Sequence, residues 1–318
     1  MPRHVQFLTE HSVSRIPPIL CAIILIFPKC YPDRMKFYFA FDSDESIRNI
    51  CNEITGMTYT PDIDEADVVF FGPKPQIGKS TKILQRLYAG TDDLNLSSIP
   101  AGITVLSNAG GYNEPVAETV FALLLSHYKK VCRHNSDMHA GIYKKLGVET
   151  LFGKRIGIYG FGGIGQQVAK IASVMGMQVA AYSRHRIPFP DVTWHDSLEK
   201  LAESIDILVI CTPLSPETKG IINASILDRF KGNCIVNIAR ANIVDQDSML
   251  SFLSRNSDKY FLTDVWWGEP NIKVIPPENC VVTPHIGGNG GEYRNEAFAR
   301  AFRSVKSFLE GNMHNVVK

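Results

Sequence analysis

The chain has 318 residues, 20% of them charged, and its 33 Lys and Arg against 32 Asp and Glu leave a formal net charge of +1. A chain of this length is long enough for two domains, each with its own hydrophobic core. The near-neutral charge creates no global field that attracts polyanions, so we expect no nucleic-acid partner.

The first 34 residues contain an apolar run, residues 16–27, that follows basic residues and superficially resembles a signal peptide. The run is shorter than the about 20 apolar residues that span a bilayer. No small-residue cleavage pattern precedes Met35. We therefore expect residues 1–34 to be an N-terminal extension outside the fold, and we expect no membrane partner.

The seven cysteines are odd in number, widely spaced and without a Cys-x-x-Cys pair. This pattern argues against a disulfide framework and against a zinc site, so we expect no metal and a reducing, cytoplasmic environment. Cys211 and Cys234 lie in apolar strand-like runs, which favours small buried hydrophobic side chains over a catalytic role.

From Met35 onward, short β-like runs alternate with helical stretches, a pattern typical of a parallel α/β domain. An acidic cap at residues 43–46 opens the first helix. The other runs in this part of the chain cover residues 67–72, 82–90 and 102–107. The tripeptide Asn113-Glu114-Pro115 then marks the start of a long, very apolar helix predicted over residues 116–131.

A second α/β series follows, with strand candidates at residues 155–160, 177–183, 206–213, 233–239, 259–266 and 280–285. Six strands in this order predict a doubly wound dinucleotide-binding domain. Residues 291–310 predict a final amphipathic helix that ends at Gly311. The fold class is therefore α/β, with two doubly wound parallel-sheet domains.

A glycine-rich hexad, GFGGIG, comes directly after the first strand of this second series and opens a helix. In this context the first glycine permits a tight turn, the second lets backbone amides approach a pyrophosphate, and the third lets helix and strand pack closely. The helix N-terminus adds N–H groups and a partial positive charge. We expect a dinucleotide to contact Gly160, Gly162, Gly163, Ile164 and Gly165.

The end of the next strand decides the cofactor, because an Asp or Glu there normally binds the adenosine ribose hydroxyls. This chain has Ser183 followed by Arg184, which can hydrogen-bond and pair with a 2′-phosphate, while His185 and Arg186 add positive charge. The pattern favours NADP. The alternative is a solvated basic turn that accepts either cofactor, so NAD stays possible.

Four further segments, residues 211–223, 237–245, 264–270 and 283–288, resemble the D-isomer-specific 2-hydroxyacid dehydrogenases in order and spacing. The resemblance runs from about Met35 to the C-terminus. It implies a flavodoxin-like substrate domain and a Rossmann-type cofactor domain, hydride transfer between NADP(H) and a small 2-keto acid, and a homodimer. By this resemblance the substrate domain comprises residues 35–107 and 287–318, the cofactor domain residues 108–286, and the dimer interface residues 108–145.

The same resemblance implies three catalytic residues. Arg240 would bind the carboxylate and carbonyl of the substrate, because a planar guanidinium can hold two oxygens in a fixed orientation. His285 would be the general acid, since imidazole has an ordinary pKa near 6.5. Glu269 would orient that imidazole and raise its pKa.

The remaining residues implied by the resemblance bind cofactor or substrate. Asp264 would hydrogen-bond the nicotinamide carboxamide, and Thr212, Pro213 and Ala239 would line the cofactor. The amides of Ala89 and Gly90 would bind the substrate carboxylate, together with Arg240 and His285. Ala241, where the family usually has glycine, and Tyr88, which enlarges the substrate loop, depart from the pattern and leave the size of the substrate open.

Two alternatives remain at this point. A phosphoglycerate dehydrogenase would need basic residues for a substrate phosphate. A dinucleotide-sensing interaction protein could use the same scaffold and keep the catalytic trio. The apolar stretch at residues 117–125 would leave an exposed patch on a monomer, which is a further reason to expect a dimer. The keto acid itself, whether glyoxylate, hydroxypyruvate or another, stays open.

Overall fold

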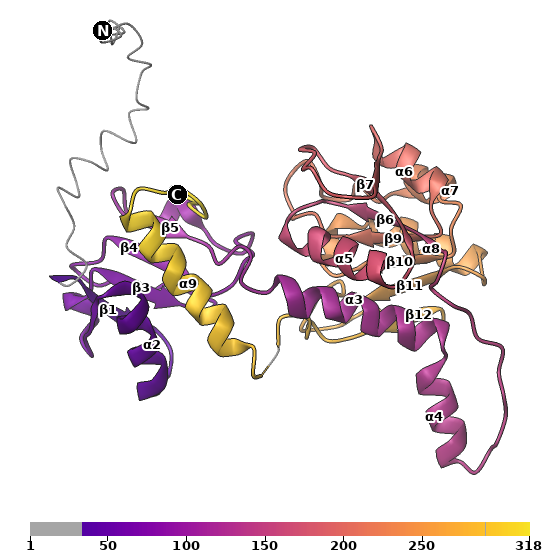
Figure 1. Cartoon of the computed structure of the whole chain (residues 1–318), viewed down its shortest axis with the longest axis horizontal. Helices are drawn as coiled ribbons and strands as arrows, with labels where there is room; N and C mark the ends of the chain where they lie inside the picture. Colours follow the sequence, from indigo (N-terminus) through magenta and orange to yellow (C-terminus); the bar gives the residue numbers. More distant parts are fainter. Residues whose placement is uncertain (1–33, 290) are drawn as a thin grey trace, which may run out of the picture.

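Two parallel β-sheets organise the computed structural model, which describes residues 34–289 and 291–318. The apolar run at residues 16–27 lies outside the described residues. Among those described, no helix has the length and apolar character needed to cross a membrane. The two sheets lie in separate lobes, which α3 (Asn113–Tyr128) and the segment before α9 (Arg294–Leu309) connect (Figure 1).

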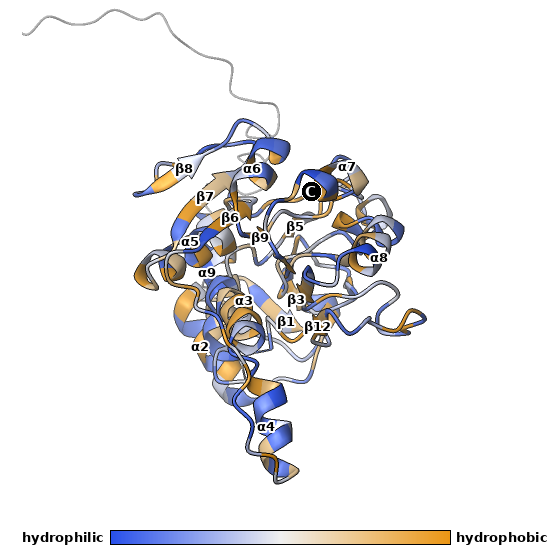
Figure 2. Ribbon diagram, turned by 90° about the vertical axis from the view of Figure 1, so that its right-hand side faces the viewer, coloured by the Kyte–Doolittle hydropathy of each residue, from blue (hydrophilic) through white to orange (hydrophobic). Residues whose placement is uncertain are grey.

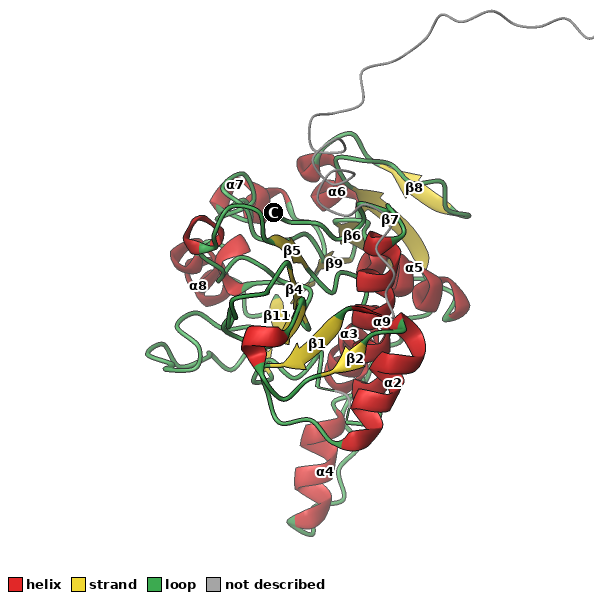
Figure 3. Cartoon of the chain, turned by 90° about the vertical axis from the view of Figure 1, so that its left-hand side faces the viewer, coloured by secondary structure: helices red, strands yellow, loops and turns green. Residues whose placement is uncertain are grey.

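The first sheet has five parallel strands in the order β2-β1-β3-β4-β5, the flavodoxin-like order that the family resemblance implied. Its strands are β1 (Lys36–Phe39), β2 (Thr58–Tyr59), β3 (Val68–Phe71), β4 (Ile83–Arg86) and β5 (Thr104–Leu106). The helices α2 (Glu45–Thr55) and α9 pack side by side on one face (Figure 3). Phe37, Phe70 and Phe302 are fully buried between them and the sheet, so the C-terminal helix completes the core of the N-terminal lobe.

The second sheet has seven parallel strands in the order β12-β11-β10-β9-β6-β7-β8. Counted from β6, this is the 3-2-1-4-5-6 order of a dinucleotide-binding domain, extended by one strand. Its strands are β6 (Arg155–Tyr159), β7 (Gln178–Tyr182), β8 (Val192–Trp194), β9 (Ile207–Ile210), β10 (Cys234–Asn237), β11 (Tyr260–Thr263) and β12 (Cys280–Val282). The sequence did not predict β8, a short edge strand of three residues.

Helices cover both faces of the second sheet, each against its own apolar core. One face carries α3 and α5 (Gly163–Val174), and the other carries α6 (Leu198–Ser204), α7 (Ala224–Arg229) and α8 (Gln246–Arg255). Short 3₁₀ turns occupy Ile63–Glu65, Leu96–Ser98 and Ala241–Ile243. This three-layer packing leaves the two ends of the strands as the places where ligands can reach the sheet.

The predicted caps and stops are found where backbone groups need partners. Asp44 accepts a hydrogen bond from the Ile47 amide at 2.9 Å, so it is the acidic cap that opens α2. Two residues after α9, Gly311 adopts φ 98°, a left-handed conformation that glycine tolerates and that stops the helix.

Two expectations for residues 116–131 are wrong. The helix α3 ends at Tyr128, because Lys130 adopts φ 52° and a separate helix, α4 (Val131–His139), leaves in a new direction. The apolar stretch at residues 117–125 is also mostly buried, since α3 packs on α5 and the sheet. Several exposed apolar side chains belong instead to α4 and the loop that follows it, those of Val131, Met138, Ile142 and Tyr143. The helix α4 projects from the rest of the chain (Figure 2).

The two cysteines singled out from the sequence lie in the core of the second lobe. Cys234 is buried and Cys211 is partly buried. Burial raises the pKa of both thiols, that of Cys211 to about 12, which disfavours the reactive thiolate. This placement confirms that both side chains pack as small hydrophobic groups.

Candidate functional site

Five residues expected to bind the cofactor or to act in catalysis follow the carboxyl ends of strands in the second sheet. Gly160 follows β6, Thr212 follows β9, Arg240 follows β10, Asp264 follows β11 and His285 follows β12. Because these strands are parallel, their carboxyl ends meet at one edge, which is where doubly wound sheets bind ligands.

The glycine loop has the geometry of a phosphate cradle. Gly160 adopts φ 93°, and a Cβ there would lie 2.6 Å from the backbone nitrogen of Thr212. A Cβ on Gly165 would collide with the carbonyl oxygen of Gly160, so the helix can pack on the turn only without a side chain. At Gly162, the N-cap of α5, a Cβ would meet nothing within 4 Å, which leaves the approach to the helix N-terminus open.

Two neighbours of this loop complete its surroundings. A Cβ on Gly163 would collide with the side chain of Asn113, from the start of α3, and Ile164 packs partly buried against the core. Thr212 is 8% exposed beside the turn, and the carbonyl of Pro213 accepts a hydrogen bond from Thr218 Oγ1 at 2.7 Å. The residues present therefore fit a dinucleotide whose pyrophosphate lies at the start of α5.

The turn after β7 presents one cation that makes no ion pair among the described residues, although its charge acts on the Glu217 carboxylate. Within residues 34–289 and 291–318, Arg184 makes no hydrogen bond or ion pair, and Ser183 precedes it at the strand end. Arg186, expected to add positive charge, instead pairs with Asp196 at 2.5 Å. The positive charge of the turn is therefore concentrated on Arg184.

Arg240 is held from both lobes. The side chain of Asn237 bridges the Ala239 amide and the Arg240 carbonyl, at 3.0 and 2.9 Å, which fixes the turn that carries the guanidinium. Arg240 Nη1 donates to the Ala239 carbonyl at 2.8 Å. From the other lobe, both carboxylate oxygens of Asp92 accept from Arg240 Nε at 3.1 Å.

The substrate loop after β4 touches the same guanidinium. A Cβ on Gly90 would collide with Arg240 Nη2, so only glycine permits this approach. The neighbouring Asp93 binds Arg86, which is 5% exposed, through both carboxylate oxygens at 2.5 and 2.8 Å. This ion pair closes the base of the loop that contains Ala89 and Gly90, and it lowers the pKa of the Asp93 carboxyl.

His285 and Glu269 form a direct pair. Nδ1 of the imidazole lies 2.9 Å from Glu269 Oε1, and the Glu269 carboxylate also accepts from the Trp266 amide at 3.3 Å. The hydrogen bond to Glu269 raises the pKa of His285 against the opposing effect of burial. Burial by itself raises the pKa of Glu269, but its hydrogen bonds and the nearby positive charges outweigh that effect and the net shift is downward.

Asp264 is almost completely buried, 2% exposed, between β11 and the segment around His285. Its carboxylate accepts hydrogen bonds from Thr283 Oγ1, from the Ile286 amide and from the Gly287 amide, at 2.6, 2.8 and 2.6 Å. Asp264 was expected to bind a nicotinamide carboxamide, and these three partners within the protein already occupy both of its oxygens.

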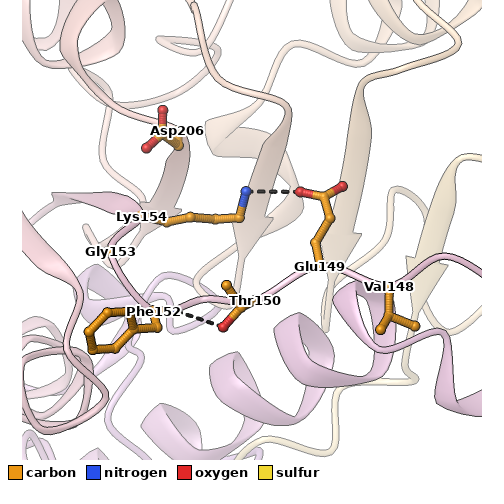
Figure 4. Close-up of a pocket in the computed structure, with 7 residues that line it drawn as sticks. All are labelled: Val148, Glu149, Thr150, Phe152, Gly153, Lys154 and Asp206. Atoms are coloured by element: carbon orange, nitrogen blue, oxygen red, sulfur yellow. Dashed lines mark hydrogen bonds and ion pairs between the residues drawn. The ribbon is translucent and has the colours of Figure 1, made fainter.

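A pocket of about 550 Å³ lies away from this edge, near the starts of β6 and β9 (Figure 4). Its charged lining is paired internally, because Lys154 donates to Glu149 at 2.9 Å. Phe152 and Val148, both exposed, supply the apolar part of the lining. The pocket brings together none of the residues expected to do chemistry, so the candidate site is the edge between the two lobes.

Sequence reasoning missed three contributors to this edge. Asp92 lies two residues after Gly90 of the expected substrate loop, but its partner Arg240 lies 148 residues away and nothing local predicts the pair. Asn237 and Thr283 belong to motifs that were singled out, yet their roles depend on hydrogen bonds to backbone groups. A polar residue at the end of an apolar strand, close in sequence to an expected catalytic residue, is the signal that could have found both.

Comparison with known proteins agrees with this geometry. The family model of the NAD binding domain of D-isomer specific 2-hydroxyacid dehydrogenases matches residues 121–287. A D-3-phosphoglycerate dehydrogenase from Haemophilus influenzae is 32% identical over 68% of this chain, and the match spans 56% of that protein. A hydroxypyruvate reductase from Thermotoga maritima is 30% identical over 68% of this chain and 74% of its own length.

A solved structure supports the same assignment over more of the chain. The structure of a glycerate dehydrogenase related protein from Thermoplasma acidophilum is 36% identical, with a TM-score of 0.70, and covers 86% of this chain and 99% of its own. The glycine loop, the strand order and these matches point to one family. The chain belongs to the D-isomer-specific 2-hydroxyacid dehydrogenases, a family of NAD-binding oxidoreductases.

Proposed function

We propose that this chain reduces a small 2-keto acid, glyoxylate or hydroxypyruvate, to the 2-hydroxy acid with NADPH. One observation carries the proposal. A guanidinium, Arg240, and a carboxylate-bound imidazole, His285, follow adjacent parts of one sheet edge, and the backbone of Gly90 in the other lobe faces the guanidinium. Substrate-orienting and proton-donating groups are thus available at a single place.

In this proposal Arg240 binds and orients the substrate. Its Nε and Nη2 face the Asp92 carboxylate at 3.1 Å, and its Nη1 donates to the Ala239 carbonyl. The two oxygens of a keto acid would bind the face of the guanidinium that Asp92 occupies here, next to Gly90. The amides of the loop at Ala89 and Gly90 would share the substrate carboxylate. A guanidinium fixed on three sides holds the carbonyl in one orientation, which is the main requirement for hydride transfer.

His285 would donate the proton. Nδ1 is bound to Glu269, which leaves Nε2 as the donor toward the substrate carbonyl oxygen. Because the hydrogen bond to Glu269 raises the pKa of His285, the imidazole stays protonated to a higher pH than an isolated histidine. Reduction needs this protonated form, so activity should fall as the pH rises through the raised pKa.

The cofactor would lie along the same edge, with its pyrophosphate at the start of α5 and its adenosine ribose at Ser183 and Arg184. A bound nicotinamide supplies the hydride. We favour NADP over NAD because the guanidinium of Arg184 makes no hydrogen bond or ion pair in the part of the chain that the structure describes, and a 2′-phosphate could therefore bind it. Ser183→Asp should shift the preference toward NADH, as measured by kcat/KM for both cofactors; an unchanged ratio would overturn this choice.

The substrate should carry no phosphate. Asp92 and Asp93 place two carboxylates beside the loop, and Arg86 and Arg240 each pair with one of them. A phosphorylated keto acid would bring more negative charge next to these carboxylates. Both arginines at the loop, Arg86 and Arg240, are already paired with them and would not neutralise the added charge. This arrangement favours glyoxylate or hydroxypyruvate over the substrate of a phosphoglycerate dehydrogenase.

We also propose that the lobes divide at residues 108 and 287 and that the chain forms a homodimer in the cytoplasm. Support for the dimer comes from α4 and the loop after it, within residues 108–145, where Val131, Met138 and Tyr143 are 52%, 57% and 79% exposed. Apolar side chains gathered on a projecting arm are typical of an interface. Light scattering on the purified protein should give twice the chain mass, and a monomer at micromolar concentration would contradict the dimer.

The direct test is a panel of 2-keto acids assayed by absorbance of NADPH and NADH in parallel. Glyoxylate, hydroxypyruvate and 3-phosphohydroxypyruvate cover the competing substrates. We expect a higher kcat/KM with NADPH and with an unphosphorylated acid. Preference for the phosphorylated acid would replace this proposal by phosphoglycerate dehydrogenase, and no turnover with any keto acid would favour a dinucleotide-sensing interaction protein.

A further inference from the structure

The carboxylate of Asp264 binds one short segment on both sides of His285. Thr283, two residues before the histidine, donates its hydroxyl to Oδ1 at 2.6 Å. Ile286 and Gly287, directly after it, donate their amides to Oδ1 and Oδ2 at 2.8 and 2.6 Å. The three donors thus enclose the residue that lies between them.

The enclosed residue has a backbone conformation that it would rarely adopt unaided. His285 has φ 55°, in the left-handed region that residues other than glycine rarely adopt. Contacts with the surrounding structure must therefore stabilise this backbone conformation. Successive amides next to a left-handed residue converge on one anion. Here that anion is the buried carboxylate of Asp264.

The fit is close enough to exclude a side chain at the far end of the segment. A Cβ on Gly287 would lie 2.8 Å from Asp264 Oδ2, tighter than real Cβ contacts. At the near end, the Thr283 amide bonds to the Thr263 carbonyl at 3.0 Å, next to Asp264 in sequence. The segment is therefore anchored to the end of β11 along its whole length.

We propose that Asp264 is a positioning residue, which holds the backbone of His285 so that the imidazole meets Glu269. This role is additional to the nicotinamide contact that the family resemblance implies. It rests on the proposed function in one respect, namely that His285 is the proton donor. Asp264 and its three donors at Thr283, Ile286 and Gly287 together form what we call the clamp.

Weakening the clamp should change the pKa of the His285 imidazole. The charged groups that face His285 are Glu269, Arg240 and Asp264. If the segment relaxes, the 2.9 Å bond from Nδ1 to Glu269 lengthens and the pKa of His285 falls toward its ordinary value. Loss of the Asp264 charge would also lower this pKa directly, so the two effects must be separated.

Two variants make that separation. Asp264→Asn removes the charge and one acceptor oxygen, whereas Thr283→Val keeps the charge and removes one hydrogen bond at nearly constant volume. Asp206→Asn is the matched control, because Asp206 also accepts from a backbone amide and a side chain, those of Arg155, but at the opposite ends of the strands. The readout is the titration of the His285 ring by NMR, with its signal identified among nine histidines from the spectrum of His285→Gln.

We expect both clamp variants to lower the pKa of His285, and the control to leave it unchanged. In a Glu269→Gln background, Thr283→Val should have no further effect on the titration. With hydroxypyruvate, kcat should fall in Asp264→Asn, on the order of 10²-fold for a displacement of about 1 Å. An unchanged pKa in Thr283→Val would overturn the clamp. The titration needs no turnover, so an inactive wild-type protein would refute the proposed function and not the clamp.

Discussion

Each of the two cations at the site is bound by a carboxylate, but the two pairs are built differently. His285 and Glu269 follow neighbouring strands of one sheet and lie 16 residues apart. Arg240 and Asp92 come from different lobes and lie 148 residues apart. The proton donor is therefore oriented within one rigid unit, whereas the orientation of the substrate-binding guanidinium depends on how the two lobes meet.

This difference assigns separate sensitivities to the two pairs. Changes in the His285 pair should alter the proton-transfer step and its pH dependence. Changes in the Arg240 pair that keep the positive charge of Arg240 should alter substrate binding without moving the pH limit, since that charge also acts on the pKa of His285. Substitutions that break one pair while leaving the other intact test whether the site is divided in this way.

The largest effect is expected from loss of the proton donor. His285→Ala should lower kcat by about 10²–10⁴-fold, the usual contribution of general acid catalysis, because no other group replaces the imidazole. Steady-state kinetics with NADPH and hydroxypyruvate measure it. His314→Ala, which removes an exposed histidine near the C-terminus, is the control and should keep normal turnover. Near-normal turnover in His285→Ala would refute this role.

The next effect concerns the guanidinium. Arg240→Lys should lower kcat/KM on the order of 10²-fold, mainly through KM, since one ammonium cannot reproduce a planar two-oxygen contact. Arg229→Lys changes an exposed arginine paired with Glu203 and should be neutral. An Arg240→Lys enzyme with an unchanged KM for the keto acid would show that the substrate binds elsewhere.

A smaller loss should follow from breaking the contact between lobes. Asp92→Asn should raise KM for the keto acid by roughly tenfold, because a hydrogen bond to a charged group contributes about 1.5–3 kcal/mol before solvent screening. The pH limit of activity should not move. A shift of that limit would mean that the two pairs are not independent.

The smallest effect on rate, and the clearest on pH, is expected at Glu269. In Glu269→Gln the neutral amide no longer raises the pKa of His285, so the protonated imidazole is lost at a lower pH. The pH above which reduction fails should therefore move downward, as read from kcat/KM against pH. A profile identical to that of the wild type would leave Glu269 without the proposed role.

Local sequence patterns were sufficient to predict the features that depend only on residues close together in the chain. The glycine loop, the cap at Asp44 and the stop at Gly311 follow from backbone requirements that particular residues satisfy. The carboxyl ends of parallel strands also predicted which segments would lie at one edge, because that edge is a property of the strand order.

Features that depend on contacts between residues far apart in the chain could not be predicted from the sequence. The pairing of Asp92 with Arg240 joins two lobes, and the clamp at Asp264 acts on backbone amides that carry no sequence signal. The burial of α3 depends on its packing against α5, and an apolar run looks the same whether its partner is in the same chain or in another. Arg186 was likewise expected to attract a cofactor phosphate, but its ion pair with Asp196 neutralises its charge, and the sequence does not predict that pair.

In the proposed mechanism Arg240 binds the substrate and His285 transfers the proton, and these are two separable roles. Oxamate, an unreactive analogue of a 2-keto acid, separates the two roles, because its affinity for the NADPH-loaded protein can be measured by calorimetry without turnover. We predict that Arg240→Ala abolishes oxamate binding, whereas His285→Ala retains most of it and still fails to turn over hydroxypyruvate. Oxamate binding lost in His285→Ala and retained in Arg240→Ala would contradict both assigned roles.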